Sequence, residues 1–249
     1  GYSDIRDTRD KIRRWGPDTL IYLSEPSSLF KLIREYLFFR SCGIRSFKAF
    51  PLGRSLRTYQ QISKLKWEPE HARLLRAVSP KKKYVADWSY NFDGEKFKEA
   101  NKIVATWPGK QNFISLSIGA KLPDKDWGDK NWTLLLEWLA VHDASLGIMA
   151  IGSGLEKTRI GSLLAPWPGP VLNLCGTTSP ITSALAMRNA KFYLGHDSGP
   201  MHLAALAGIR CVAVFSARAK PGVWFPHGEG HEILYPWHEA AKVPAKTGL

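Results

Sequence analysis

The segment "KFYLGHDSGPMHLAALAGIRCVAVFS", residues 191–216, contains one strand–helix–strand repeat. KFYLG is an apolar, strand-like run, and the polar turn HDSGP follows it. PMHLAALAG then has the composition of a helix, and IRCVAVFS, residues 209–216, predicts the next strand, because short apolar runs rich in β-branched residues are typical of buried strands. This order of elements indicates a parallel sheet.

The same alternation extends backwards along the chain to residue 112. Apolar runs predict strands over 112–118, 146–152 and 171–176, and helical spacing predicts helices over 131–143 and 155–165. Another helix is predicted to begin at the N-cap Ser179, with Pro180 in its first position. Five short strands separated by helices predict an α/β fold with a doubly wound, largely parallel sheet.

Ligands of such sheets bind beyond the carboxyl ends of the strands. Glycines and hydroxyl residues gather after the predicted strands, as Gly119-Ala120, Gly152-Ser153-Gly154, Gly176-Thr177-Thr178 and His196-Asp197-Ser198-Gly199. These loops are therefore expected to converge on one binding cleft.

The first part of the chain is less regular. A strand is predicted over 18–24, helices over 28–43 and 71–78, an irregular segment over 51–69, a linker over 79–91 and a bridging helix over 95–107. One strand and two helices are too few for a complete Rossmann-like domain. We therefore predict a partial N-terminal α/β domain over 1–92 and a Rossmann-like domain over 93–249.

The net charge of +13 lies almost wholly in the first part of the chain. Residues 1–110 carry 23 Lys and Arg against 12 Asp and Glu, whereas residues 111–249 carry 12 against 10. Such an excess favours a polyanionic partner, either nucleic acid, anionic lipid or a phosphorylated glycan, although it is also compatible with a solvated basic surface. The sequence contains no aromatic RNP-type strand, helix-turn-helix or zinc pattern, so we expect no nucleic-acid partner.

The composition also bears on the compartment. No apolar run of about 18 residues predicts a membrane span, and the charged start, GYSDIRDTRDKIRRWG, lacks the apolar core of a signal peptide. Cys42, Cys175 and Cys211 lie far apart without metal-ligand spacing, and Cys175 and Cys211 sit in apolar runs. We therefore expect buried free thiols, a reducing, cytoplasmic location, and neither a metal nor a cofactor.

The turn at 196–200 has the properties of an anion site. Backbone N–H groups at a helix start point outward, so Ser198 and Gly199 could donate to a diphosphate. His202 lies one turn into the helix and would be a further donor, unless it packs under the sheet. A Ser198–His202–Asp197 triad is disfavoured, because no GxSxG elbow is present.

Three charged side chains follow other strands. Lys121 and Lys125 could neutralise a leaving phosphate, or could be solvated surface lysines. Glu156 begins the helix after the strand at 146–152, where a carboxylate could bind a ribose diol or complement the helix dipole.

Several motifs resemble those of glycosyltransferase family 9, the lipopolysaccharide heptosyltransferases. They are GAK…DKDWGDKNW, IGSGLEK, LCGTTSP and HDSGPMHLAALAG…VAVFSARAKPGVWFP, and they agree in order and spacing over residues 112–227. Residues 18–78 resemble the second half of the family's N-terminal domain more loosely. The resemblance implies a GT-B fold and inverting, metal-independent transfer of a sugar from a nucleotide donor, ADP-heptose in the heptosyltransferases, to an anionic glycan or glycolipid.

The resemblance also implies roles for residues. Lys125 would contact the donor diphosphate and Glu156 the ribose. Asp197 would hold hydroxyls of the transferred sugar, so that Asp197 and Lys125 are the residues expected to act in catalysis. The remaining donor-binding residues expected are Gly119, Ala120, Lys121, Thr177, Thr178, Ser198, Gly199, Pro200 and His202.

Some positions depart from the family pattern. Gly128 stands where the family has Pro, and Ser216-Ala217 replaces a Phe-Gly-Pro-like turn. The family's first strand and its Gly-Asp loop, which supplies the expected general base, have no counterpart, and the tail PWHEAAKVPAKTGL ends where the family continues into closing helices. The alternatives are a glycosyltransferase and a catalytically incomplete nucleotide-sugar-binding fragment or module. The transferase would act in the cytoplasm, either free or at the inner face of the inner membrane.

Overall fold

The computed structural model describes residues 2–24, 28–51, 53, 56–80, 88–91, 93–109 and 112–239. The chain divides into two compact units. Unit 1 consists of residues 1–87, 219–224 and 239–249, and unit 2 of residues 88–218 and 225–238. Parts of the predicted linker, residues 81–87, and of the C-terminal tail, residues 240–249, lie outside the described residues.

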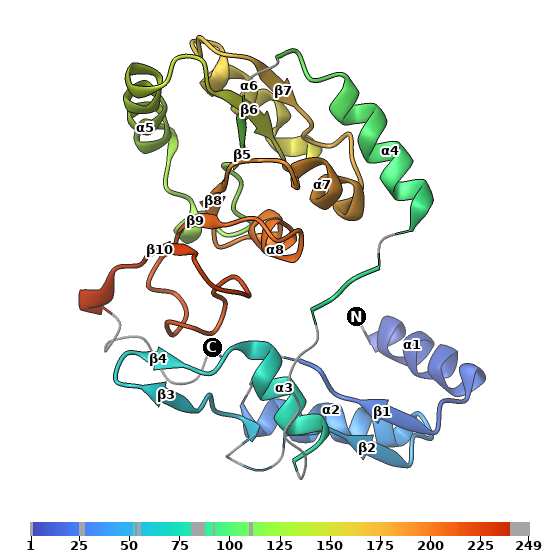
Figure 1. The fold of residues 1–249 in the computed structure, drawn as a ribbon. Helices are drawn as coiled ribbons and strands as arrows, with labels where there is room; N and C mark the ends of the chain where they lie inside the picture. Colours follow the sequence, from blue (N-terminus) through green and yellow to red (C-terminus); the bar gives the residue numbers. More distant parts are fainter. Residues whose placement is uncertain are drawn as a thin grey trace. The chain divides into compact units, whose positions relative to one another are not determined.

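Unit 2 is built on a six-stranded sheet in which every neighbouring pair is parallel. Its strand order is β7-β6-β5-β8-β9-β10 (Figure 1). The strands are β5 (Phe113–Ser117), β6 (Gly147–Ala150), β7 (Val171–Asn173), β8 (Tyr193–His196), β9 (Cys211–Val214) and β10 (Glu232–Leu234). The α/β fold and its parallel sheet are confirmed. The edge strand β10 was not predicted, because two of its three residues are exposed and it forms no apolar run in the sequence.

The helices of unit 2 follow the predicted alternation. They are α4 (Gly94–Ala105), η2 (Pro123–Lys125), α5 (Asp129–His142), η3 (Gly154–Glu156), α6 (Lys157–Leu164), α7 (Pro180–Met187) and α8 (Gly199–Leu206), followed by η4 (Trp237–Glu239) at the boundary with unit 1. Ser179 caps α7 as predicted, since its side chain accepts a 3.2 Å hydrogen bond from the Thr182 backbone. Figure 1 shows α4 lying alongside α7.

The main core of unit 2 lies between one face of the sheet and the helices α5 and α6. Its members are fully or almost fully buried: Ile114, Leu116, Ile148 and Ala150 from the sheet, Trp132 and Leu136 from α5, and Ile160 and Leu164 from α6. Alternate residues of each strand point to the opposite face. That face carries Ser115, Ser117 and Tyr193, all buried.

Unit 1 contains two small sheets. Its elements are α1 (Tyr2–Trp15), β1 (Thr19–Ile21), α2 (Leu29–Ser41), β2 (Ser46–Lys48), β3 (Gln61–Ser63), β4 (Lys66–Trp67) and α3 (Glu70–Val78). β1 pairs with β2 in parallel, and β3 with β4 in antiparallel. The prediction of an irregular segment over 51–69 was wrong for the short strands β3 and β4. The highly charged α1 and the exposed β2 were not predicted, because neither presents a clear apolar face.

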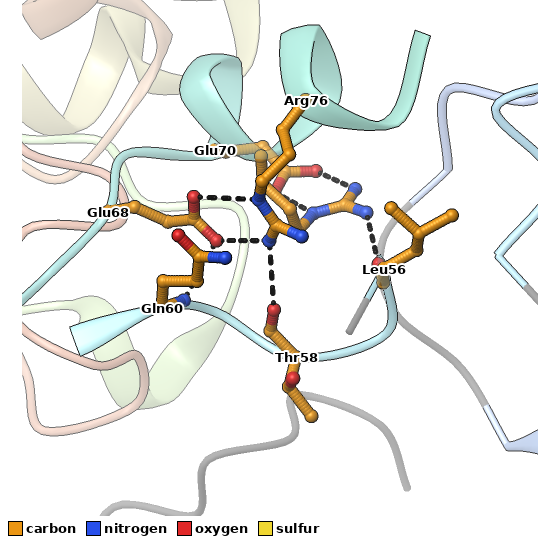
Figure 2. Close-up of polar contacts among 7 residues, drawn as sticks. Leu56, Thr58, Gln60, Glu68, Glu70 and Arg76 are labelled. Carbon is orange, nitrogen blue, oxygen red and sulfur yellow. Dashed lines mark hydrogen bonds and ion pairs between the residues drawn. The ribbon is translucent and has the colours of Figure 1, made fainter. Parts of the chain in front are cut away.

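A network of buried charges ties α3 to the loop before β3 (Figure 2). The Arg73 guanidinium donates two 2.6 Å hydrogen bonds to the Glu70 carboxylate. Arg76 pairs with Glu68 and donates a 3.2 Å hydrogen bond to the Thr58 carbonyl. Because each buried charge faces an opposite one, the usual cost of burying an ion is offset. The network fixes the loop of residues 56–60 against α3.

The described residues also bear on the predicted compartment. All three cysteines are buried and free, as expected. Among the helices that the structure describes, none is long and apolar enough to cross a membrane.

Candidate functional site

The strand order of unit 2 fixes where a ligand can bind. The chain leaves β5 toward β6 on one side, and leaves β8 toward β9 on the other, while β5 and β8 are neighbours with Ser117 opposite Gly195. Such a switch point opens a crevice at the carboxyl ends of the two strands. Gly119-Ala120 follows β5 directly, and Asp197-Ser198 follows β8, so both predicted loops lie at this point.

Lys125 and Asp197 meet at the switch point. The Lys125 Nζ atom lies 2.6 Å from Asp197 Oδ2, although 72 residues separate them in sequence. Their side chains are 19% and 9% exposed, so the pair is partly shielded from water. The sequence predicted both residues, but did not predict that they pair with each other. In this structure the ammonium is therefore neutralised by the carboxylate.

The loop that carries Lys125 is held by its neighbours. The backbone N–H of Trp127 donates a 2.9 Å hydrogen bond to Nε2 of the buried His196. Asp126 receives hydrogen bonds of 2.6 and 2.9 Å from the Arg159 guanidinium, which holds the pKa of that carboxyl below its usual range. Burial lowers the pKa of His196, which favours the neutral ring that can accept the Trp127 bond.

Gly128 ends this loop with an unusual backbone. Its φ is 84°, and its N–H donates a 2.9 Å hydrogen bond to Asp126 Oδ1. Proline can supply neither feature, since its φ is fixed near −65° and it has no N–H. The chain path that this structure shows before α5 therefore suits glycine at position 128 and not proline.

The Glu156 carboxylate packs against the glycine after β5. A Cβ atom added to Gly119 would lie 2.1 Å from Glu156 Oε1, so only glycine leaves room for the carboxylate there. Glu156 also accepts a 2.8 Å hydrogen bond from the Ser153 backbone in a capping box. The Glu156 carboxylate thus caps the start of its own helix, and it also lies beside the end of β5.

The hydroxyls of Thr177 and Thr178 are used locally. Thr177 Oγ1 donates a 2.9 Å hydrogen bond to the Leu174 carbonyl, and Thr178 Oγ1 shares a 2.7 Å hydrogen bond with Ser183. These bonds shape the turn after β7. Thr177 is nevertheless exposed to solvent.

The N-terminus of α8 is open. Ser198 is the N-cap residue, but its side chain makes no capping bond, and its hydroxyl donates only a 3.4 Å hydrogen bond to the His196 carbonyl. Pro200 lies in the first turn, and a Cβ added to Gly199 would meet nothing within 4 Å. Unsatisfied N–H groups and a helix dipole favour an anion at such an end.

His202 lies on the exposed surface of α8 and is not packed under the sheet. Although the residue is exposed, neighbouring protein atoms crowd its ring; this partial loss of water is the main cause that lowers the pKa of His202, and Lys125 acts in the same direction. Asp197 acts in the opposite direction. Lys121 is also exposed. Among the described residues, no cluster of His, Cys, Asp and Glu is arranged to hold a metal.

Sequence reasoning missed the residues that hold the site together. His196 was placed only as part of a polar loop, and Arg159 was not considered. A histidine at the end of a buried strand and directly before Asp197 was a usable signal. The salt bridge between Arg159 and Asp126 gave no signal in the sequence, because the two residues are 33 positions apart.

Three solved structures show the same fold. A family 9 glycosyltransferase from Veillonella parvula has a TM-score of 0.65 at 15% identity, covering 97% of this chain and 69% of its own. The E. coli ADP-heptose lps heptosyltransferase II has a TM-score of 0.58 at 16% identity, with coverages of 94% and 75%. The E. coli heptosyltransferase WaaC with ADP has a TM-score of 0.54 at 17% identity, with coverages of 98% and 74%. No curated protein matches the chain.

The parallel sheet, its switch point and these likenesses define an α/β protein of the GT-B glycosyltransferase class. The family model of glycosyltransferase family 9 (heptosyltransferase) matches residues 45–245, and the chain belongs to this family of enzymes.

Proposed function

We propose that this chain transfers a heptose-like sugar from ADP-heptose, with inversion and without a metal, to a lipopolysaccharide-type acceptor. The observation that carries the proposal is the Lys125–Asp197 pair beside the open N-terminus of α8. A cation, a carboxylate and unpaired backbone donors are thereby gathered at the switch point. The solved relatives include an ADP-heptose lps heptosyltransferase and the heptosyltransferase WaaC with ADP and with ADP-2-deoxy-2-fluoro heptose, which supports an adenine nucleotide donor.

In this proposal three groups of residues bind three parts of the donor: the diphosphate, the nucleoside and the sugar. The diphosphate binds Lys125, His202 and the α8 turn of Ser198, Gly199 and Pro200, with Lys121 at the rim. Glu156 binds the ribose, beside Gly119 and Ala120, while the turn of Thr177 and Thr178 lines the nucleotide pocket. Asp197 holds hydroxyls of the sugar.

The proposed reaction is a single displacement. The acceptor oxygen forms a bond to the anomeric carbon from the side opposite the diphosphate, and the bond to the leaving phosphate oxygen breaks, so the configuration inverts. Lys125 and the helix N-terminus stabilise the charge that develops on the departing diphosphate. The acceptor hydroxyl gives its proton to a base that we do not assign to a described residue.

A second candidate is a nucleotide-sugar-binding module without transfer activity. The specific observation is that Asp197, the carboxylate beside the open turn, is already paired with Lys125. Because Lys125 occupies Oδ2 of Asp197 in this structure, that carboxylate is better placed to hold the sugar than to accept the acceptor proton.

The acceptor is proposed to be a phosphorylated glycan or glycolipid. The support is the concentration of positive charge in residues 1–110, which would attract such an anion or the anionic inner face of a cytoplasmic membrane. Its location in the cytoplasm is part of the same proposal.

Calorimetric titration with ADP, UDP and GDP tests the donor assignment. We expect ADP to bind most tightly, and binding of no nucleotide would overturn both candidates. Incubation with ADP-heptose and a deacylated lipopolysaccharide acceptor then separates them. Release of ADP with formation of glycosylated acceptor supports the transferase, whereas binding of ADP-heptose without transfer supports the binding module.

A further inference from the structure

The tyrosine of β8 carries a hydroxyl whose burial the fold does not explain. Tyr193 is fully buried, and its Oη atom makes no hydrogen bond of normal length and angle to any described residue. A buried hydroxyl without a partner destabilises a protein, and such groups are rare in native structures. Phenylalanine would fill the same space without this cost.

The Tyr193 side chain leans along β8 toward the switch point. A Cβ atom added to Gly195 would lie 2.3 Å from Tyr193 Oη and 2.7 Å from the Ser117 carbonyl oxygen. Glycine at position 195 therefore leaves the space that the phenol occupies. The hydroxyl reaches the carboxyl end of β8, directly behind the turn that begins α8.

Two serine hydroxyls lie near the phenol. Burial raises the pKa of Tyr193, and hydrogen bonding to the hydroxyls of Ser198 and Ser117 acts against this rise, so these two serines are the available partners of the phenol. The Ser117 hydroxyl is itself buried without a partner. Ser198 donates a long, 3.4 Å hydrogen bond to the His196 carbonyl, so its oxygen can accept a closer hydrogen bond from the phenol and its proton can be redirected.

We propose that Tyr193 is a positioning residue for the donor diphosphate. When a phosphate oxygen lies at the N-terminus of α8, Ser198 donates its proton to that oxygen and accepts a hydrogen bond from Tyr193 Oη. The chain Tyr193–Ser198–phosphate satisfies the buried phenol, and each bond strengthens the next because donors in series polarise one another. Tyr193 touches no donor atom and acts through Ser198. This inference rests on the proposed function, in which the α8 turn binds the diphosphate.

The test compares Tyr193→Phe with the matched control Ser115→Ala. Ser115 lies opposite Tyr193 in the sheet and also carries a buried, unpaired hydroxyl, but Ser198 is not among its neighbours in the chain or the sheet register. We expect Tyr193→Phe to weaken ADP binding about three- to tenfold, the effect of one neutral hydrogen bond. Adenosine affinity and the melting temperature should not fall. Ser115→Ala should leave ADP and adenosine affinity unchanged.

A double-mutant cycle identifies the route. In a Ser198→Ala background, Tyr193→Phe should have no further effect on ADP affinity. The inference is overturned if Tyr193→Phe leaves ADP affinity unchanged, if it weakens ADP and adenosine equally, or if it prevents folding. Failure of the wild type to bind ADP overturns the proposed function as well. Weaker ADP binding in Lys125→Ala with an unaffected Tyr193→Phe overturns the inference alone.

Discussion

The pairing of Lys125 with Asp197 predicts that Asp197→Asn strengthens the binding of ADP. In the ligand-free chain the ammonium and the carboxylate are 2.6 Å apart, so a phosphate must compete with Asp197 for the same cation. Asparagine keeps the shape of the side chain and removes its negative charge. The phosphate then meets an unpaired ammonium and no repelling carboxylate.

The size of the effect follows from the geometry. Two unit charges at this separation attract each other by about 6 kcal/mol at an effective dielectric constant of about 20. Loss of hydration by both groups cancels most of this energy, which leaves a net coupling of about 1–2 kcal/mol. We therefore expect ADP to bind about five- to thirtyfold more tightly to Asp197→Asn.

ADP-heptose should respond differently, because its sugar would lose hydrogen bonds to a charged group worth about 1.5–3 kcal/mol. The gain seen for ADP should therefore be cancelled or reversed. Lys125→Ala should weaken ADP about 10- to 100-fold and leave adenosine unchanged. Lys191→Ala, which removes an exposed lysine before β8, is the control and should behave as wild type.

Calorimetry with ADP, ADP-heptose and adenosine measures all of these affinities. If Asp197→Asn weakened ADP as much as Lys125→Ala does, the carboxylate would not compete with the phosphate, and the division of the donor between the two residues would be refuted.

Three further predictions concern stability and local packing. His196→Phe removes the acceptor of the Trp127 N–H, so Tm should drop by the equivalent of about 1–3 kcal/mol. Because burial holds the pKa of His196 below its ordinary 6.5, the unfolded chain binds a proton at this histidine more tightly than the folded chain does. The Tm of the wild type should therefore fall as the pH drops below 6.5, and the Tm of His196→Phe should fall less. Gly119→Ala forces the flexible Glu156 side chain to move away from the Ser153 N–H, so the variant should lose the free energy of that one hydrogen bond, about 0.5–1.5 kcal/mol in chemical denaturation; an unchanged midpoint would contradict the packing. Burial lowers the pKa of Lys220, and its ammonium has no carboxylate partner in the described chain. Lys220→Met should therefore keep the free energy of unfolding in urea within about 1 kcal/mol of wild type or raise it. A loss above about 3 kcal/mol would count against this reasoning.

The repeating part of the chain was predictable because each signal is local. Buried strands such as Phe113–Ser117 are short apolar runs, and glycine or hydroxyl residues mark the turn that follows each of them. The start of α7 is likewise indicated by two adjacent residues, the N-cap Ser179 and Pro180 in the first helical position. Family motifs then singled out Lys125, Glu156 and Asp197.

The contacts that assemble the site were not predictable, because they join distant residues. The bond between Trp127 and His196 spans 69 residues, and the Lys125–Asp197 pair spans 72. Strand alternation showed Tyr193 as one more apolar position, and gave no sign that its hydroxyl is buried without a partner. Side-chain pairing of this kind depends on the strand order, which the local pattern does not specify.

The most direct test of the account is a crystal structure of the chain with ADP. We predict diphosphate density at the N-terminus of α8, with Lys125 turned from Asp197 toward a phosphate oxygen and Ser198 within hydrogen-bonding distance of it. Density for the diphosphate away from the carboxyl ends of β5 and β8, with the Lys125–Asp197 pair intact, would contradict the central claim.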